Sequence, residues 1–157
     1  MYRIMLADDE GIVLDALKFI IEKNFGDTCQ IETAKTGRSV IELAEQFSPD
    51  IALMDIQMSG INGIEAIKEI RKRNNHTQFI IVSAYDKFDY AKEAINLGVV
   101  DYINKPICQD VIVEVLKKAM KTLDTERHKR SSDLMIREKL ENVVPVIESG
   151  FIYSILF

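Results

Sequence analysis

Short apolar segments of strand type alternate five times with amphipathic segments over about residues 1–122, and this alternation constrains the fold more than any other feature. A helix between two strands carries the chain back over the sheet, so that the next strand pairs in parallel. The apolar segments are too short for helices and are rich in Ile, Val, Leu and aromatic residues. The predicted strands are residues 2–7, 29–34, 50–54, 79–82 and 101–103.

The segments after these strands carry apolar residues at spacings of three and four, the pattern of a helix with one buried face. Gly98 is expected to end the fourth helix. The pattern predicts an α/β fold, a doubly wound five-stranded parallel sheet in (βα)5 order. The apolar positions of the five helices are Ile12, Ala16, Leu17, Ile20 and Ile21; Val40, Leu43, Ala44 and Phe47; Ile64, Ile67 and Ile70; Ala91, Ala94, Ile95 and Leu97; and Val111, Val115, Leu116 and Ala119.

The composition changes once, at residues 124–133, a stretch of ten residues without an apolar side chain. We place a domain edge there, between a domain of residues 1–122 and a helical extension of residues 123–157 that continues the fifth helix. Pro145 is expected to end or kink this extension nearby. A lone helix cannot bury its apolar stripe, so we expect residues 134–157 to pack against the same segment of a second chain. A remnant of a truncated protein is the alternative interpretation.

Composition and charge argue against several classes of protein. The chain has 20 basic and 25 acidic residues and a net charge of -5, which disfavours sequence-independent binding to nucleic acid or to an anionic membrane. Cys29 and Cys108 lie apart without metal-ligand spacing, so we expect two reduced, buried thiols rather than a disulfide or zinc site. No apolar run approaches the roughly 18 residues of a membrane span, and we expect a cytoplasmic protein without a membrane partner.

Polar residues follow four of the predicted strands, where the side chains of a doubly wound sheet converge on one crevice. Asp8, Asp9 and Glu10 follow the first strand, Asp55 the third, Ser83 the fourth and Lys105 the fifth. Carboxylates packed together repel one another unless a cation lies among them, and hard oxygen ligands favour Mg²⁺. We therefore expect a magnesium site in which Asp55 is the nucleophile toward a phosphoryl group whose oxygens Ser83 and Lys105 bind.

Several of these residues also have a purely structural interpretation. Asp8 and Asp9 alone would be the polar cap of a helix beginning near Gly11, and Tyr102 would be a packing residue of a short strand. Polar residues at four strand ends together favour the functional interpretation. In the functional interpretation, the Lys105 ammonium has no partner until a phosphoryl group arrives. Lys105→Ala should therefore leave folding and Mg²⁺ binding largely intact.

The chain resembles the receiver domain of bacterial two-component response regulators in several separated motifs. They are ADDE at 7–10, MDIQM around Asp55, SAY at 83–85 and DYINKP at 101–106. The resemblance covers residues 1 to about 122. It implies a flavodoxin-like sheet with the strand order 2-1-3-4-5 and a sensor histidine kinase as partner.

The resemblance implies a role for each matching residue. A cis peptide bond is implied at Pro106. The roles are phosphoacceptor for Asp55, metal-binding acids for Asp8 and Asp9, metal ligand through the main-chain carbonyl for Gln57, phosphate-binding lysine for Lys105, switch hydroxyl for Ser83 and switch aromatic for Tyr102.

The expected switch couples Ser83 to Tyr102 at matching height on neighbouring strands: the hydroxyl moves toward the phosphoryl group, and the ring turns inward. The face of the fourth helix, fifth strand and fifth helix should then change, and it is a second candidate for a homodimer interface. The chain departs from the family at Ser59, where a proline usually lies four residues after the phosphoacceptor. We therefore expect a less rigid loop there.

Residues 84–106 also resemble receivers attached to AraC-type helix-turn-helix output domains. We expect a fragment of a longer transcription factor whose output domain is absent, so that DNA is a partner only through that domain. This expectation assigns the chain to signalling rather than to catalysis on outside substrates.

Two other functions stay open. A small Mg²⁺-dependent aspartyl-phosphate phosphohydrolase would share the pocket, but such enzymes need a second acid two residues after the nucleophile, where this chain has Gln57. An interaction module that is never phosphorylated is disfavoured by the acidic residues and Lys105. Nucleotide binding is disfavoured because neither a dinucleotide-binding nor a P-loop glycine motif occurs.

Overall fold

The computed structural model describes the backbone of residues 1–84 and 88–147, and the side chains of residues 1–84 and 90–130. Within this part of the chain, five parallel strands form one sheet in the order β2-β1-β3-β4-β5, which confirms the predicted order. Each strand begins and ends within one residue of its predicted bounds. The strands are β1 (Tyr2–Ala7), β2 (Cys29–Ala34), β3 (Ile51–Met54), β4 (Gln78–Ser83) and β5 (Asp101–Asn104).

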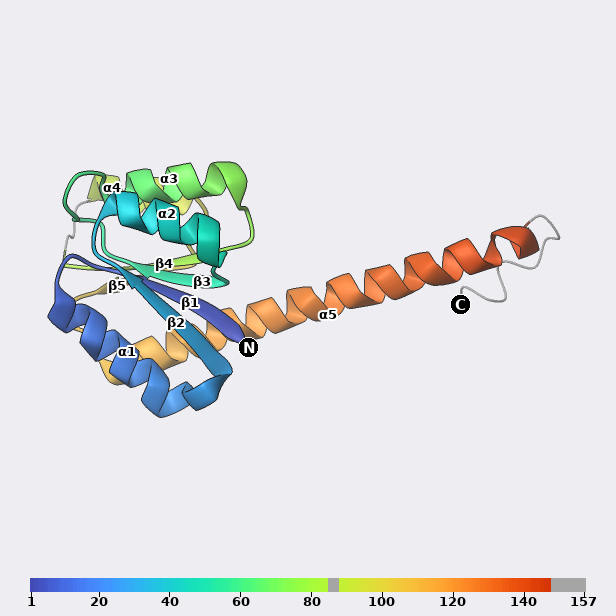
Figure 1. The fold of residues 1–157 in the computed structure, drawn as a ribbon, viewed down its shortest axis with the longest axis horizontal. Helices are drawn as coiled ribbons and strands as arrows, with labels where there is room; N and C mark the ends of the chain where they lie inside the picture. Colours follow the sequence, from blue (N-terminus) through green and yellow to red (C-terminus); the bar gives the residue numbers. More distant parts are fainter. Residues whose placement is uncertain (85–87, 148–157) are drawn as a thin grey trace. The chain divides into compact units, whose positions relative to one another are not determined.

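Helices follow the strands and cover both faces of the sheet, as predicted for a doubly wound fold. Figure 1 shows α2, α3 and α4 on one face, and α1 with the first turns of α5 on the other. A 3-10 turn that the sequence did not predict, η1 (Gly26–Thr28), joins α1 to β2. The helices are α1 (Gly11–Phe25), α2 (Gly37–Phe47), α3 (Gly63–Arg73), α4 (Phe88–Asn96) and α5 (Gln109–Ile147).

Side-chain caps fix the start of two helices that follow strands. At α2, the Thr36 hydroxyl accepts the Ser39 amide while the Ser39 hydroxyl accepts the Thr36 amide, which is a capping box. At α3, the Asn62 side chain accepts the Glu65 amide at 2.9 Å. The caps set where the chain turns from strand to helix, at the edge of the sheet where the polar residues gather.

The hydrophobic core lies on both sides of the sheet. Every residue of β3 and β4 is buried, as expected for central strands covered by helices on both faces. Phe79 is among the largest wholly buried side chains and packs in the layer that contains Ile64 and Ile67 of α3. This packing holds the ends of β3 and β4 in fixed positions.

The buried face of α1 agrees with the predicted one at Leu17, Ile20 and Ile21 and differs from it nearer the start of the helix. Ile12 is 78% exposed and Ala16 is also exposed, so both predictions are wrong. Spacings of three and four fit two alternative stripes on this helix, and packing on the sheet selects the one that starts at Leu14, about 200° around the helix from Ile12. The buried residues of α1 are Leu14, Leu17, Ile20 and Ile21.

Two residues of the predicted apolar helix faces are exposed, and both cysteines are less buried than predicted. Ile95 is 75% and Val111 is 40% exposed, because α4 and α5 turn neighbouring side chains toward the sheet instead. Cys29 is half-buried and Cys108 is exposed, so the predicted burial of both thiols is wrong. Cys29 begins an edge strand, and Cys108 precedes α5 outside the core.

The chain divides into two compact units, Met1–Met120 and Lys121–Phe157. As predicted, the fifth helix continues beyond Leu123 through the exposed residues 124–130, and it is described to Ile147, two residues after Pro145. The predicted self-association of residues 134–157 falls on side chains outside the described residues and stays a prediction. Across the described part of the chain, every helix is too short or too polar to cross a lipid bilayer.

Candidate phosphoacceptor site

The carboxyl ends of the parallel strands meet at one edge of the sheet, where backbone hydrogen bonds fix the residues that follow them. The Asp55 amide donates to the Ala7 carbonyl at 2.8 Å, and the Lys105 amide donates to the Ser83 carbonyl at 3.0 Å. The strand ladder therefore extends past β3 and β5 by one residue. This places the Asp55 and Lys105 backbones on the rigid sheet rather than on a free loop.

A pocket of about 340 Å³ opens at this edge. Carboxylate oxygens of Asp8, Asp9 and Asp55 lie within 4.8 Å of one another. Asp8 is 1% and Asp55 is 6% exposed, whereas Asp9 is open to solvent. The structure thus brings together every predicted site residue except Tyr102. The pocket is lined by Asp9, Glu10, Asp55, Gln57, Met58, Ser59, Ser83, Ala84 and Lys105.

Lys105 bridges two of the three carboxylates. Its Nζ lies 2.9 Å from Asp8 Oδ2 and 3.3 Å from Asp55 Oδ2. The expectation that this ammonium has no partner before a phosphoryl group arrives is therefore wrong. Two buried carboxylates on adjacent strands need a counter-charge, and the lysine at the end of β5 is long enough to supply it.

The surroundings shift the pKa of both partners. Burial raises the pKa of the Asp55 carboxyl and the charge of Asp8 raises it further, while Lys105 and a hydrogen bond from Ser83 only partly offset this. Burial lowers the pKa of the Lys105 ammonium, but the hydrogen bond to Asp8 and the charges of Asp55 and Asp8 outweigh burial, so that this pKa is raised. Ionised Asp55 therefore destabilises the folded state, which is common for groups that take part in catalysis.

We expect Asp55→Asn to raise the thermal unfolding temperature of the metal-free protein by a few degrees at neutral pH. The folded-state pKa of Asp55 is raised, so stability is lost as the pH rises through that pKa. The gain should vanish below the ordinary pKa of 3.8 and grow toward neutral pH. Thermal unfolding of both proteins in chelator across this range tests it, and an equal gain at every pH would contradict it.

Asp8 and Asp9 do not cap α1. The N-cap of this helix is Glu10, whose side chain makes no capping hydrogen bond. Asp8 Oδ1 accepts the Glu10 amide at 2.9 Å, a bond that lies within the turn before the helix. The interpretation of the two acids as a helix cap is therefore wrong, and both belong to the acidic cluster.

The β3–α3 loop, residues 55–62, forms one wall of the pocket. Its base is closed by Gly63, whose amide donates to the Ile56 carbonyl at 2.7 Å. A Cβ at Gly63 would lie 2.1 Å from the Asp55 carbonyl oxygen, so only glycine lets α3 begin this close to the strand end. The Gln57 amide lies 3.4 Å from Asp55 Oδ1. The loop is thus folded tightly around the carboxylate.

The sequence analysis gave no role in the site to four of the lining residues, Glu10, Met58, Ser59 and Ala84. Their position along the chain could have indicated them, because each lies within four residues of a predicted site residue. The predicted cis peptide bond between Lys105 and Pro106 is present.

Tyr102 lies outside the acidic pocket. It pairs with Ile81 in the β4–β5 ladder, whereas Ser83 pairs with Asn104. The expectation that Ser83 and Tyr102 lie at matching height is therefore wrong by two residues, because alternation of apolar and polar residues does not define register between strands. The two side chains still belong to the same face of the sheet, since residues two apart on a strand point the same way.

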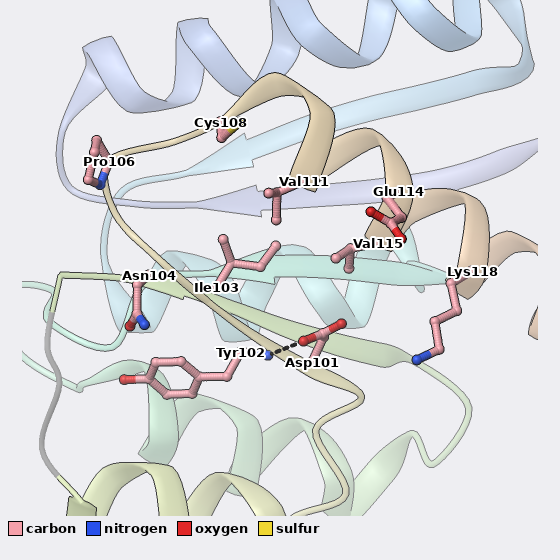
Figure 2. Close-up of a pocket in the computed structure, with 10 residues that line it drawn as sticks. All are labelled: Asp101, Tyr102, Ile103, Asn104, Pro106, Cys108, Val111, Glu114, Val115 and Lys118. Atoms are coloured by element: carbon pink, nitrogen blue, oxygen red, sulfur yellow. Dashed lines mark hydrogen bonds between the residues drawn. The ribbon is translucent and has the colours of Figure 1, made fainter.

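A second pocket, of about 500 Å³, lies between β5 and α5 and shares no lining residue with the acidic pocket. Figure 2 shows that Tyr102 and Ile103 leave β5 on opposite sides, with Ile103 on the side of Val111 and Val115. This pocket belongs to the face formed by α4, β5 and α5, which the sequence analysis predicted to respond to phosphorylation.

The site and the fold place the chain in a known family. The response regulator receiver domain matches residues 4–117. The chain therefore belongs to the response regulator receiver domains, the modules of two-component systems, and its acidic pocket is formed by Asp8, Asp9 and Asp55. Membership implies a cognate histidine kinase.

Curated relatives include longer regulators. The chain is 32% identical over 143 residues to the uncharacterized transcriptional regulatory protein YesN of Bacillus subtilis, covering 91% of this chain and 39% of the relative. It is 32% identical over 123 residues to the transcriptional regulatory protein HptR of Staphylococcus aureus, covering 78% of this chain and 48% of the relative. The chain thus spans less than half of the length of these two relatives.

Solved structures show the same fold. A CheY-like receiver domain protein from Methanospirillum hungatei superimposes with a TM-score of 0.75 at 25% identity, over 80% of this chain and 98% of that one. The REC domain of AraT, a response regulator from Geobacillus stearothermophilus, gives 0.72 at 30% identity, again over 80% and 98% of the two chains.

Proposed function

We propose that Asp55 accepts a phosphoryl group from a sensor histidine kinase in a Mg²⁺-dependent reaction, and that the receiver then changes conformation to control transcription. The observation that carries this proposal is the acidic cluster around Asp55, with the Lys105 ammonium 3.3 Å from the Asp55 carboxylate. A nucleophilic carboxylate, neighbouring acids and a lysine together suit phosphoryl transfer, because they supply the attacking oxygen and the groups that neutralise phosphoryl charge.

In the proposed step, an Asp55 carboxylate oxygen attacks the phosphorus of a kinase phosphohistidine. A P–O bond forms as the P–N bond breaks, and the histidine nitrogen leaves with the electron pair and takes up a proton from water. The hydrogen bond from the Asp55 amide to the Ala7 carbonyl holds the nucleophile on the sheet. Ser83 and Lys105 bind the phosphoryl oxygens, so Lys105 exchanges a carboxylate partner for a phosphoryl oxygen.

The donor set fits Mg²⁺, since clustered carboxylate oxygens are the hard ligands that this ion prefers. Asp8, Asp9, Asp55 and the main-chain carbonyl of Gln57 would hold the ion. When bound, Mg²⁺ neutralises charge on the phosphoryl group during transfer. The exposed Asp9 completes the cluster on its solvent side.

The proposed switch joins Ser83 to Tyr102 on one face of the sheet. Tyr102 is half-buried and packs against the core layer between the sheet and α3. A rotation of its ring would therefore change the packing of that layer. Movement of the Ser83 hydroxyl toward the phosphoryl group opens space that the Tyr102 ring fills. The α4–β5–α5 face then differs between the two states.

We further propose that the receiver governs a DNA-binding output domain of AraC type. Support comes from longer relatives named as transcriptional regulatory proteins, and from the likeness to the REC domain of AraT. DNA is then a partner only through that domain. Residues 134–157 or the α4–β5–α5 face would join two copies, and we place the protein in the cytoplasm.

Two other functions have less support. A phosphohydrolase would need a general acid at position 57, and the side chain there is the amide of Gln57, which lines the pocket. We therefore propose that the chain does not act as an enzyme on outside substrates. Burial of the Asp55 carboxylate beside Asp8 disfavours its ionised form and raises its pKa. A module that is never phosphorylated would not need a carboxylate in this unfavourable position.

Incubation with a small phosphodonor and Mg²⁺, followed by intact mass measurement, tests the proposal. We expect the mass of one phosphoryl group, in a linkage that hydroxylamine cleaves as it does any acyl phosphate, and no addition in excess chelator. Continuous release of phosphate from unrelated phosphomonoesters would favour the phosphohydrolase instead. Absence of any added mass with both the small donor and a phosphorylated kinase would favour the interaction module.

A further inference from the structure

The loop after Asp55 is supported by a second part of the fold, the first turn of α2. Thr36 and Ser59 form an isolated parallel β-bridge that belongs to none of the five strands. Thr36 is the residue that the α2 capping box fixes through Ser39. The β3–α3 loop is therefore paired, at the position where this chain lacks the usual proline, with a residue held rigidly by a helix cap.

The next residue of α2 lies against the same loop. A Cβ at Gly37 would lie 2.1 Å from the Ile61 carbonyl oxygen and 2.7 Å from Ile61 Cβ. Because the nearest atom is backbone, a larger residue at this position could be accommodated only by moving the loop. Gly37 is buried, so this contact excludes water.

Ser59 connects this contact to the pocket. It pairs with Thr36 and also lines the acidic pocket, two residues after Gln57. Gly63 holds the other end of the loop against Ile56. A loop held at its base by Gly63 and near its tip by α2 keeps few backbone conformations, which a proline would otherwise achieve by stiffening the chain.

We propose that Thr36 and Gly37 are positioning residues for the phosphoacceptor pocket: through the Thr36–Ser59 bridge and the Gly37–Ile61 contact, the first turn of α2 sets the loop that carries Gln57. This inference rests on the proposed function, because the loop is placed for the Mg²⁺ ligands. Its measurable consequence is Mg²⁺ affinity rather than the chemistry of Asp55, which β3 positions independently.

Titration of the isotope-labelled full chain with Mg²⁺, followed by NMR, tests the proposal. Gly37→Ala should weaken Mg²⁺ binding by about tenfold or more, the range seen when groups that orient metal ligands are removed. Phosphorylation at saturating Mg²⁺ should recover to near the wild-type rate. Gly26→Ala is the control. Gly26 has a φ of 56° and nothing within 4 Å of an added Cβ, so this substitution strains the backbone at a position far from the loop.

Two variants of Ser59 decide the matter even if Gly37→Ala fails to fold. Both Ser59→Ala and Ser59→Gly remove the hydroxyl, but only glycine frees the backbone. We expect Mg²⁺ binding to be about two- to fivefold weaker in the glycine variant than in the alanine variant. Equal affinities for this pair, or a folded Gly37→Ala within twofold of wild type, would overturn the inference. A wild-type protein that binds no Mg²⁺ at the pocket would instead overturn the proposed function, and the inference with it.

Discussion

Asp55→Asn should reduce phosphoryl incorporation to background, with the fold intact. The asparagine side chain has no ionised oxygen to attack phosphorus. Its size matches that of the carboxylate, and the backbone hydrogen bond from residue 55 to the Ala7 carbonyl is unchanged. Intact mass after incubation with a small phosphodonor and Mg²⁺ measures the loss. The same variant is expected to be more stable than wild type without metal, so inactivity cannot be attributed to unfolding.

A matched control is Asp15→Asn, which removes a carboxylate from the exposed side of α1 and leaves the pocket unchanged. It should be phosphorylated like wild type. Incorporation that persisted in Asp55→Asn and disappeared on changing another residue would move the phosphoacceptor elsewhere. Equal loss in both variants would indicate an effect of net charge rather than of one nucleophile.

Lys105→Ala should destabilise the metal-free protein by about 1.5–3 kcal/mol, the range for hydrogen bonds to charged groups. The variant leaves the Asp8 and Asp55 carboxylates without the ammonium that lies 2.9 and 3.3 Å away. Mg²⁺ should bind more tightly than in wild type, because no ammonium competes for those oxygens. Phosphorylation should no longer change the α4–β5–α5 face. Denaturant unfolding, Mg²⁺ titration and NMR of the phosphorylated protein measure the three effects.

Lys68→Ala provides the comparison, since Lys68 forms an ion pair with Glu93 in which both side chains are half exposed. Such surface pairs contribute little, so its stability should change by about 0.5 kcal/mol or less. A Lys105→Ala protein with wild-type stability and a wild-type phosphorylation-dependent change would show that the pairing with Asp8 is dispensable. That outcome would also remove Lys105 from the switch.

The strands and most of the site could be predicted because both depend on local patterns, whereas the strand order was implied by the resemblance to receiver domains. Five apolar runs separated by helical periods define a parallel sheet, and Asp8, Asp55 and Lys105 follow strands whose ends must meet. What failed depends on packing between distant segments. The sequence alone does not show that Lys105 reaches Asp8, which is 97 residues away along the chain.

The predicted register between β4 and β5, and the predicted burial of Ile12 at the start of α1, were wrong for the same reason. Ile12 fits an apolar period as well as Leu14 does, and only contact with the sheet separates them. Ser83 pairs with Asn104 rather than with Tyr102 because of the register between β4 and β5. The spacing of residues within one strand does not determine that register. The support of Ser59 by Thr36 likewise joins residues that no local motif connects.

β3 lies at the centre of the sheet, with every residue buried, and Asp55 is the first residue after it. Ser83 and Lys105 follow β4 and β5, which lie progressively closer to the sheet edge. Asp55, the proposed phosphoacceptor, therefore follows a central strand that is buried throughout, whereas Lys105 follows β5, a strand at the edge of the sheet. We therefore expect phosphorylation to move the backbone least at Asp55, where the group would be added, and most at the β5 edge of the sheet.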